Sequence, residues 1–406
     1  MHLIFVAPHF PTYQKRFVLA LKAVGAQVSG IGDSPEHELP SDVKQALNNY
    51  YQITNVTDAT ALTECVKYIQ SLGWVDRLEA TIESHMLAAA LTREACNIPG
   101  MNYQQTLICR DKTTMKQFLR DRGIPCAAFD AIDNPEEIKA FADEVGYPII
   151  IKPRDGAGAS ATFRCNSPQD LWPAIQATGA DKGQSVAVEE FLEGHEGFYD
   201  TLTANGQVQY EFVSHYFPNV LEAMRTRWIS PYIIVTNRSD LPDYNELKAL
   251  GRKVIEEIGL GTVPSHMEWF ATQRGLKFSE IGARPPGVGQ WDLYCAANEI
   301  DLYKEWANAI VHGQCYDLPT QRYSAAILNL RPTQDGTILG YTGVDEVMLK
   351  YGEWIISCHF PDPGTPTQPI ANGYMANAWI QMKYPDYDEL RRILMEIANT
   401  ITVHAG

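Results

Sequence analysis

Two glutamates twelve residues apart carry the strongest chemical signal in the sequence. Glu268 and Glu280 lie in two apolar runs that a short turn around Arg274 joins into a predicted β-hairpin. In this hairpin Glu268 lies opposite Glu280 and Arg284 shares their face, unless the pairing is shifted by one residue and Glu280 turns away. Two like charges that face each other destabilise a sheet unless a cation lies between them. The pair therefore predicts a Mg²⁺ site, because Mg²⁺ prefers oxygen ligands and accompanies nucleotide phosphates.

A glycine-rich segment after Lys152 could contact phosphate groups. Gly156, Gly158 and Ser160 belong to a G-x-G-x-x-A pattern, which opens a helix in dinucleotide-binding folds. Here the following residues 162–165 have the character of a strand, so the pattern predicts the tip of a β-hairpin. Such a tip can close its N–H groups over phosphates while Lys152 supplies a positive charge. A plain hairpin turn beside a surface lysine is the alternative.

An acidic turn at the end of a predicted strand suggests a nucleoside contact. In the segment 188–196, the backbone and Glu189 could bind an adenine edge. Glu196, seven residues later, could bind the ribose hydroxyls. The alternative is a solvated acidic surface.

Paired arginines and two histidines are candidates for substrate binding. Arg225 and Arg227 are two residues apart, and on an extended segment both guanidinium groups point the same way, toward a carboxylate or an acyl phosphate. Two surface arginines are the alternative. His215 and His266 could orient a substrate, although a structural histidine is the commoner case.

Composition narrows the class of protein. The chain has 406 residues, 45% of them hydrophobic, and a net charge of −16, which has the wrong sign for broad binding to nucleic acid. The eight cysteines include no C-x-x-C pair, and the N-terminus lacks the pattern of a signal peptide. No apolar stretch reaches the ~20 residues that cross a bilayer. We therefore expect a cytoplasmic protein with free thiols that acts on small molecules and binds neither nucleic acid nor membrane.

The elements around these motifs alternate between helices and strands. Residues 3–32 predict a β-α-β start without a glycine fingerprint in its first turn. Strands dominate from residue 186, and the stretch 316–406 predicts short strands and turns before a last helix. Capping residues and apolar spacing predict helices over 111–122, 135–146, from 168 onward, 244–258 and 388–401.

The order of these motifs resembles the ATP-grasp superfamily, with the layout of carbamoyl-phosphate synthetase, biotin carboxylase and the amino-acid ligases. The sequence around Lys112 resembles the first lysine motif of that family. Lys152 with its glycine-rich segment resembles the second, and the run from Glu189 to Leu192 resembles the adenine hinge. The resemblance covers roughly residues 105–310.

In the metal-binding motif, this chain differs from the usual family pattern at one position. Glu268 and Glu280 match the metal carboxylates of the family, and Arg284 matches the arginine four residues further on. The family usually has Asn two residues after the second carboxylate, where this chain has Gly282. We therefore expect one Mg²⁺ site rather than two.

The resemblance also implies a role for each motif residue. The residues implied to contact ATP are Lys112, Lys152, Gly156, Gly158, Ser160, Glu189, Glu190, Phe191, Leu192 and Glu196. The catalytic residues implied are Arg284, Lys152 and Arg227, and the metal ligands are Glu268 and Glu280. The substrate would contact Arg225, Arg227, His215, His266, Gly287 and Gly289.

The implied architecture is an α/β (α+β) ATP-grasp fold with four parts. Residues 1–105 would form a pre-ATP-grasp domain, 106–185 the small subdomain and 186–315 the large subdomain. Residues 316–406 resemble, more weakly, the C-terminal region of the carboxylase-like branch.

The implied activity is that of an ATP-dependent carboxylate-amine ligase that forms an acyl phosphate and releases ADP and phosphate. It would use ATP with Mg²⁺, or with Mn²⁺ in its place, and would act on a small carboxylate and an amine. A homodimer is the usual form that the resemblance implies. A bicarbonate-dependent carboxylase or carbamoylating enzyme and a catalytically silent ATP-binding regulator are the alternatives. A nicotinamide-dependent oxidoreductase ranks last, because the glycine pattern precedes a strand.

Overall fold

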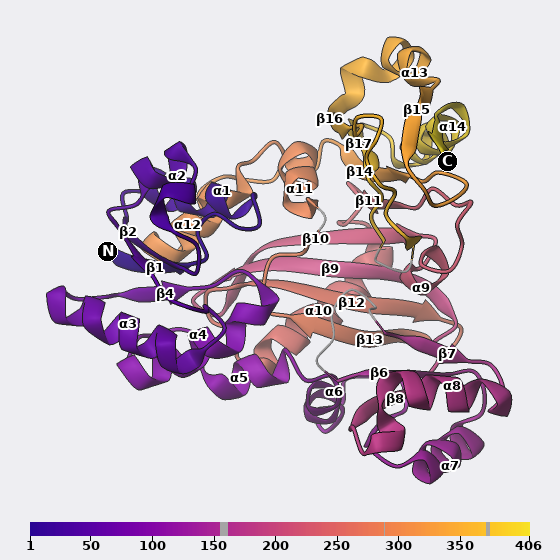
Figure 1. Ribbon diagram of the computed structural model, residues 1–406, viewed down its shortest axis with the longest axis horizontal. Coiled ribbons are helices and arrows are strands. Elements are labelled where there is room, and N and C mark those ends of the chain that lie inside the picture. The colour runs from indigo at the N-terminus through magenta and orange to yellow at the C-terminus, as the bar shows by residue number, and fades with distance from the viewer. Residues whose placement is uncertain (155–160, 288, 371–373) are drawn as a thin grey trace.

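The computed structural model describes residues 1–154, 161–287, 289–370 and 374–406. Gly156, Gly158 and Ser160, predicted as a phosphate-binding loop, lie outside the described residues. A parallel sheet, an antiparallel sheet of four strands, a long sheet of eight strands and a two-stranded ribbon form the framework of the molecule (Figure 1). Short 3-10 helices cover Glu36–Glu38, Glu83–His85, Ala180–Lys182, Pro242–Tyr244 and Gly352–Trp354.

The N-terminal unit contains the predicted β-α-β start and extends it to four parallel strands. The strands pair in the order β3-β2-β1-β4, so β2 and β4 flank β1. Buried residues run continuously along β1 and β2, as expected for a parallel sheet that helices cover. The elements are β1 (His2–Val6), α1 (Gln14–Ala23), β2 (Gln27–Gly32), α2 (Ser41–Ala46), β3 (Asn49–Gln52), α3 (Ala59–Leu72), β4 (Arg77–Glu79), α4 (Met86–Cys96) and α5 (Tyr103–Ile108).

A small antiparallel sheet follows, at the lower right of Figure 1. β6 and β7 pair antiparallel on either side of the glycine-rich segment, which confirms the flanks of the predicted hairpin. Asp111, Asn134 and Ser167 cap the three helices of this part at the predicted positions. The elements are α6 (Lys112–Arg120), β5 (Phe129–Ile132), α7 (Pro135–Val145), β6 (Ile149–Pro153), β7 (Phe163–Cys165), α8 (Pro168–Thr178) and β8 (Val186–Glu190).

The eight-stranded central sheet runs in the order β13-β12-β9-β10-β11-β14-β17-β16. Because β11 pairs with β14, the sheet continues across the predicted boundary at residue 315. The stretch after that boundary holds the helix α13, which the prediction of strands and turns missed. The elements are β9 (Gly194–Ala204), β10 (Gln207–Phe217), α9 (Val220–Ala223), β11 (Tyr232–Val235), α10 (Asn245–Ile258), β12 (Pro264–Thr272), β13 (Gly275–Gly282), α11 (Gln290–Asn298), α12 (Leu302–His312), β14 (Ser324–Leu330), β15 (Ile338–Thr342), α13 (Val344–Tyr351), β16 (Ile355–His359), β17 (Ala378–Tyr384), α14 (Tyr387–Thr400) and β18 (Thr402–Ala405).

A β-bulge sets the geometry of the β12–β13 hairpin. Near its tip, Trp269 pairs with Phe278, a register that by itself would place Ser279 opposite Glu268. The pairing then shifts by one residue, so that Glu268 pairs with Glu280 as predicted. The extra residue of the bulge places Glu280 on the face of Glu268 while Phe278 stays in the core.

The two faces of the central sheet pack against different helices. α10 and α6 share one hydrophobic core with β12 and β13, whereas α1, α11 and α12 share another with β9, β10 and β11. Successive residues of β9 and β10 alternate between these cores, as the period of a strand requires. No helix in the described part of the chain is long and apolar enough to cross a membrane.

Candidate active site

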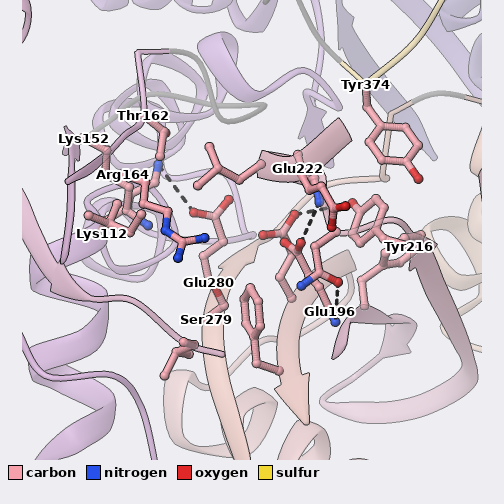
Figure 2. A pocket seen from close by; sticks show the side chains of 18 of the residues that line it. Lys112, Lys152, Thr162, Arg164, Glu196, Tyr216, Glu222, Ser279, Glu280 and Tyr374 are labelled. Carbon is pink, nitrogen blue, oxygen red and sulfur yellow. Dashed lines mark hydrogen bonds and ion pairs between the residues drawn. The ribbon is translucent and has the colours of Figure 1, made fainter. Parts of the chain in front are cut away.

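A cavity of about 900 Å³ lies between the central sheet, the small antiparallel sheet and the segment around Tyr374. Figure 2 shows Lys112 and Lys152 on one side, Glu196 and Tyr374 on the other, and Glu280 between them. The predicted residues that line the cavity are Lys112, Lys152, Glu189, Glu190, Phe191, Leu192, Glu196, Arg225, His266, Glu268, Glu280, Arg284 and Gly287. His215, Arg227 and Gly289 are not part of this lining.

The carboxylates of Glu268 and Glu280 share one wall of the cavity. Lys112 Nζ lies 3.6 Å from Glu280 Oε2, and the Tyr216 hydroxyl donates to Glu268 Oε1 at 3.5 Å. Burial alone would raise the pKa of Glu280, but Lys112 and Lys152 outweigh it and lower the pKa. The described residues form no group of three metal-ligating side chains, so the protein itself offers two carboxylates. Mg²⁺ fits this donor set, because it usually keeps several waters and binds one or two carboxylates together with substrate phosphates.

Two lysines hold Glu189 of the predicted adenine hinge. Lys116 Nζ lies 2.6 Å and Lys152 Nζ lies 3.0 Å from Glu189 Oε2. Burial alone would raise the pKa of Glu189, but the two lysines outweigh it and lower the pKa to about 2. Glu189 Oε1 is buried and has no hydrogen-bond partner among the described residues. Lys116 is absent from the predicted set, although its position one helical turn after Lys112 is a signal that could have identified it.

The remaining hinge residues connect neighbouring elements. Glu190 forms an ion pair with Arg274 at the tip of the β12–β13 hairpin, and it accepts a hydrogen bond from the Ala128 N–H at 3.1 Å. The Arg164 guanidinium lies over the Phe191 ring, 4.0 Å from its centroid. The hinge therefore contacts both the β12–β13 hairpin and β7.

Glu196 lies deeper in the cavity, beside the carboxylate pair. Its Oε2 accepts a hydrogen bond from the Val220 N–H at 2.8 Å. Burial raises the pKa of Glu196, and the charge of Glu268 raises it further. Hydroxyl donors or a nearby cation would relieve this repulsion.

Arg284 is held by a residue of the N-terminal unit. Its Nε donates to Glu83 Oε2 at 2.6 Å, and Arg110 donates to Glu83 Oε1 at 2.6 Å. Burial alone would lower the pKa of the Arg284 guanidinium, but Glu83 outweighs it and raises the pKa. No local motif marks Glu83, because its contact joins residues 201 positions apart.

The segment that carries Arg225 and Arg227 is not extended, contrary to the prediction. α9 and the turns after it occupy this position, with a hydrogen bond from the Arg225 N–H to the Glu222 carbonyl at 3.1 Å. The alternation of side chains along an extended strand therefore does not apply to these two residues. Arg225 lines the cavity, whereas Arg227 forms an ion pair with Asp335.

The two predicted histidines lie on opposite faces of the central sheet. His266 lines the cavity, where its Nδ1 lies 2.7 Å from Asp200 Oδ1. Burial would lower the pKa of His266, but Asp200 outweighs it and raises the pKa to about 9. His215 packs on the other face, with its Nε2 2.8 Å from the Tyr244 hydroxyl.

Residues 117–299 match the model of the ATP-grasp domain. This match places an ATP-grasp domain at residues 117–299. The chain is 28% identical over 306 residues to the L-arginine-specific L-amino acid ligase of Bacillus subtilis, an alignment that covers 74% of this chain and 73% of the relative. It is 25% identical over 295 residues to the formate-dependent phosphoribosylglycinamide formyltransferase of Prochlorococcus marinus, covering 71% of this chain and 72% of the relative.

Solved structures share the fold at lower identity. An L-amino acid ligase from Bacillus licheniformis superposes with a TM-score of 0.76 at 18% identity, covering 100% of this chain and 98% of that one. The N5-carboxyaminoimidazole ribonucleotide synthetase from Thermotoga maritima gives a TM-score of 0.71 at 17% identity, covering 100% and 99%.

These similarities bear on several of the predictions. They confirm the α/β ATP-grasp fold. The relatives that share it are carbon–nitrogen ligases that release ADP. ATP with Mg²⁺ is the pair that ATP-grasp enzymes use. The use of Mn²⁺, the residue roles, the domain boundaries and a homodimer stay predictions.

Proposed function

We propose that this ATP-grasp protein joins a small-molecule carboxylate to an amine through an acyl phosphate. The observation that supports the proposal most directly is the convergence of Glu268 and Glu280 with Lys112, Lys152 and Arg284 in one cavity. This arrangement provides electrostatic stabilisation without a protein nucleophile. The substrate carboxylate itself supplies the attacking oxygen.

The nucleotide would occupy the side of the cavity where the small sheet meets the central sheet. The unpaired Glu189 Oε1 offers an acceptor for an N–H of the adenine base. Glu196 offers an acceptor for ribose hydroxyls, since its buried carboxylate lies beside negative charge. Lys112 and Lys152 supply positive charge for the phosphates against the negative field of the whole chain.

The reaction would proceed in two steps, phosphorylation of the carboxylate and attack by the amine. A carboxylate oxygen of one substrate attacks the γ-phosphorus as the bond to ADP breaks. The amine nitrogen of the second substrate then attacks the acyl carbon, phosphate leaves, and the nitrogen loses a proton. Arg284 would stabilise the charge on the transferred phosphoryl group. Mg²⁺ held by Glu268 and Glu280 would supply neutralisation of phosphate charge.

Phosphate release from ATP and Mg²⁺ tests this function. Pooled carboxylic acids and amines are supplied separately and together to the wild type and to Glu280→Gln, with Glu346→Gln on exposed α13 as the matched control. We expect release that requires both substrates, persists in Glu346→Gln and falls at least 100-fold in Glu280→Gln, about 2.7 kcal/mol. Phosphate release with bicarbonate alone would indicate a carboxylase instead of a ligase. ATP binding without phosphate release would indicate a regulatory protein.

A further inference from the structure

We infer that Asp200 is a positioning residue for the reaction, because it fixes the ring of His266 with Nε2 toward Glu268. This inference rests on the proposed function and adds to it a residue behind the wall of the cavity. Asp200 belongs to β9, is 2% exposed and is not part of the described cavity lining. A carboxylate buried this deeply needs hydrogen-bond donors, so its donors show what it holds in place.

The strand pairing places Asp200 directly beside His266. The two residues are cross-strand partners in the pairing of β9 with β12. On the other side of β12, the partner of His266 is Gly282 of β13, which has no side chain. Phe198 of β9 also contacts the ring of His266, edge to face, with the ring centroids 4.9 Å apart. Of these cross-strand neighbours, the side chains of β9 therefore determine where the ring lies.

Both carboxylate oxygens of Asp200 accept hydrogen bonds from side chains. Oδ1 lies 2.7 Å from His266 Nδ1, and Oδ2 accepts a hydrogen bond from the hydroxyl of Tyr294 on α11. An ionised carboxylate only accepts hydrogen bonds, so the proton of this contact is on Nδ1 of the ring. The neutral and the charged ring can both carry that proton, so the hydrogen bond exists in both. Asp200 thus selects which edge of the ring faces the cavity.

The opposite edge of the ring faces the carboxylate pair. With Nδ1 bound to Asp200, the Nε2 of His266 lies 3.8 Å from Glu268 Oε1. His266, Glu268, Glu280 and Arg284 all line the same cavity. Groups that stabilise a transition state act best when they are already in place, and residues behind them keep them there. A ring released from Asp200 would be free to rotate, and Glu268 would lose a fixed neighbour.

The variant Asp200→Asn tests this role, because an amide has one acceptor oxygen where a carboxylate has two. His266 and Tyr294 then compete for that oxygen. We expect kcat for phosphate release to fall about 10- to 100-fold while the KM for ATP stays within about twofold, since the lysines and the hinge are untouched. The matched control is Thr203→Val, also on β9, which loses the hydrogen bond to the Val263 carbonyl at 2.8 Å and should leave kcat unchanged.

The double variant Asp200→Asn/Tyr294→Phe distinguishes a positioning role from a structural one. Without the Tyr294 hydroxyl, the amide oxygen is left to His266 alone. The double variant should therefore recover part of the kcat that Asp200→Asn loses, although it has lost one more hydrogen bond. A residue that only stabilises the fold would instead give a further loss of kcat in the double variant, and that result would overturn the inference.

NMR of protein labelled with ¹⁵N-histidine separates this inference from the proposed function, because it needs no turnover. The His266 resonances, identified by their loss in His266→Gln, should show a proton on Nδ1 in the wild type. A non-hydrolysable ATP analogue with Mg²⁺ should shift Nε2 and leave that proton in place, even if no phosphate is released. A wild-type ring without a proton on Nδ1, or an unchanged kcat in Asp200→Asn, would overturn the inference and leave the ligase intact. The wild-type spectrum gives this answer even if Asp200→Asn does not fold.

Discussion

Individual buried charged side chains determine the electrostatics of the cavity, although the chain as a whole is negatively charged. The protein has a net charge of −16, yet Lys112, Lys116 and Lys152 gather at one end of a single cavity. Glu189 keeps two of these lysines in place through its Oε2. The sequence alone predicts such a local cluster, because an anionic protein that binds phosphate needs one.

Removal of Lys116 should destabilise the protein and weaken ATP binding. Lys116→Met leaves the buried Glu189 with Lys152 alone, so we expect a loss of about 3–5 kcal/mol in unfolding free energy. The double variant Lys116→Met/Glu189→Gln should recover part of this loss, because the uncompensated charge is gone. Urea unfolding and ATP titration measure both effects, and an unchanged unfolding midpoint in Lys116→Met would contradict this reading of the ion pair.

At the scale of elements, local signals predicted most of the helices and strands. Asp111, Asn134-Pro135 and Ser167-Pro168 mark helix starts through contacts within one turn of chain, which is why they are visible in the sequence. The bulge at Ser279 and the helical turn before Arg225 depend on packing, so neither is visible in the sequence. The sequence predicts the pairing of Glu268 with Glu280 through a regular hairpin centred on Arg274. In the structure the turn of the hairpin is shorter, and the bulge restores the same pairing.

The cap of α6 links helix stability to the position of Lys112. Asp111 accepts a hydrogen bond from the Thr114 N–H at 2.8 Å and pairs with Arg154 at 2.8 Å. Burial would raise the pKa of Asp111, but Arg154 outweighs it and lowers the pKa to about 2. Asp111→Ala should cost about 1–2 kcal/mol and raise the KM for ATP, because Lys112 begins the helix that the cap fixes.

Asp111→Asn is the matched control for that prediction. It keeps an oxygen that caps the helix and loses only the charge that pairs with Arg154. Its losses in thermal stability and in ATP affinity should therefore be smaller than those of Asp111→Ala. Equal losses in the two variants would show that the ion pair, and not the cap, positions Lys112.

At the scale of the whole molecule, contacts between distant segments complete the site. Glu83 of the N-terminal unit holds Arg284, and Tyr374 near the C-terminus donates its hydroxyl to the Tyr232 carbonyl at 2.8 Å and lines the cavity. These contacts join residues far apart in sequence, so no motif could predict them.

The stability of the whole protein should depend on His215 below neutral pH. Burial, with the nearby His195, lowers the pKa of His215 to about 3, so the native ring stays neutral while the unfolded chain binds a proton below pH 6.5. The contribution of neutral His215 to the unfolding free energy is therefore complete above pH 6.5 and is lost as the pH falls toward 3. Between pH 6.5 and 5.5 this residue should account for about 1 kcal/mol of lost stability. His215→Asn should show a correspondingly shallower decrease in unfolding midpoint, and parallel curves for the two proteins would exclude the effect.

The transfer of a carboxylate oxygen to phosphate shows whether this protein forms an acyl phosphate. The carboxylate substrate is labelled with ¹⁸O on both oxygens and incubated with ATP, Mg²⁺, the amine and the wild-type protein. If an acyl phosphate forms, its bridging oxygen leaves with the phosphate, so mass spectrometry should find one ¹⁸O in each phosphate released and one in the product. Phosphate without ¹⁸O would exclude the acyl phosphate, because the carboxylate would then never have been phosphorylated.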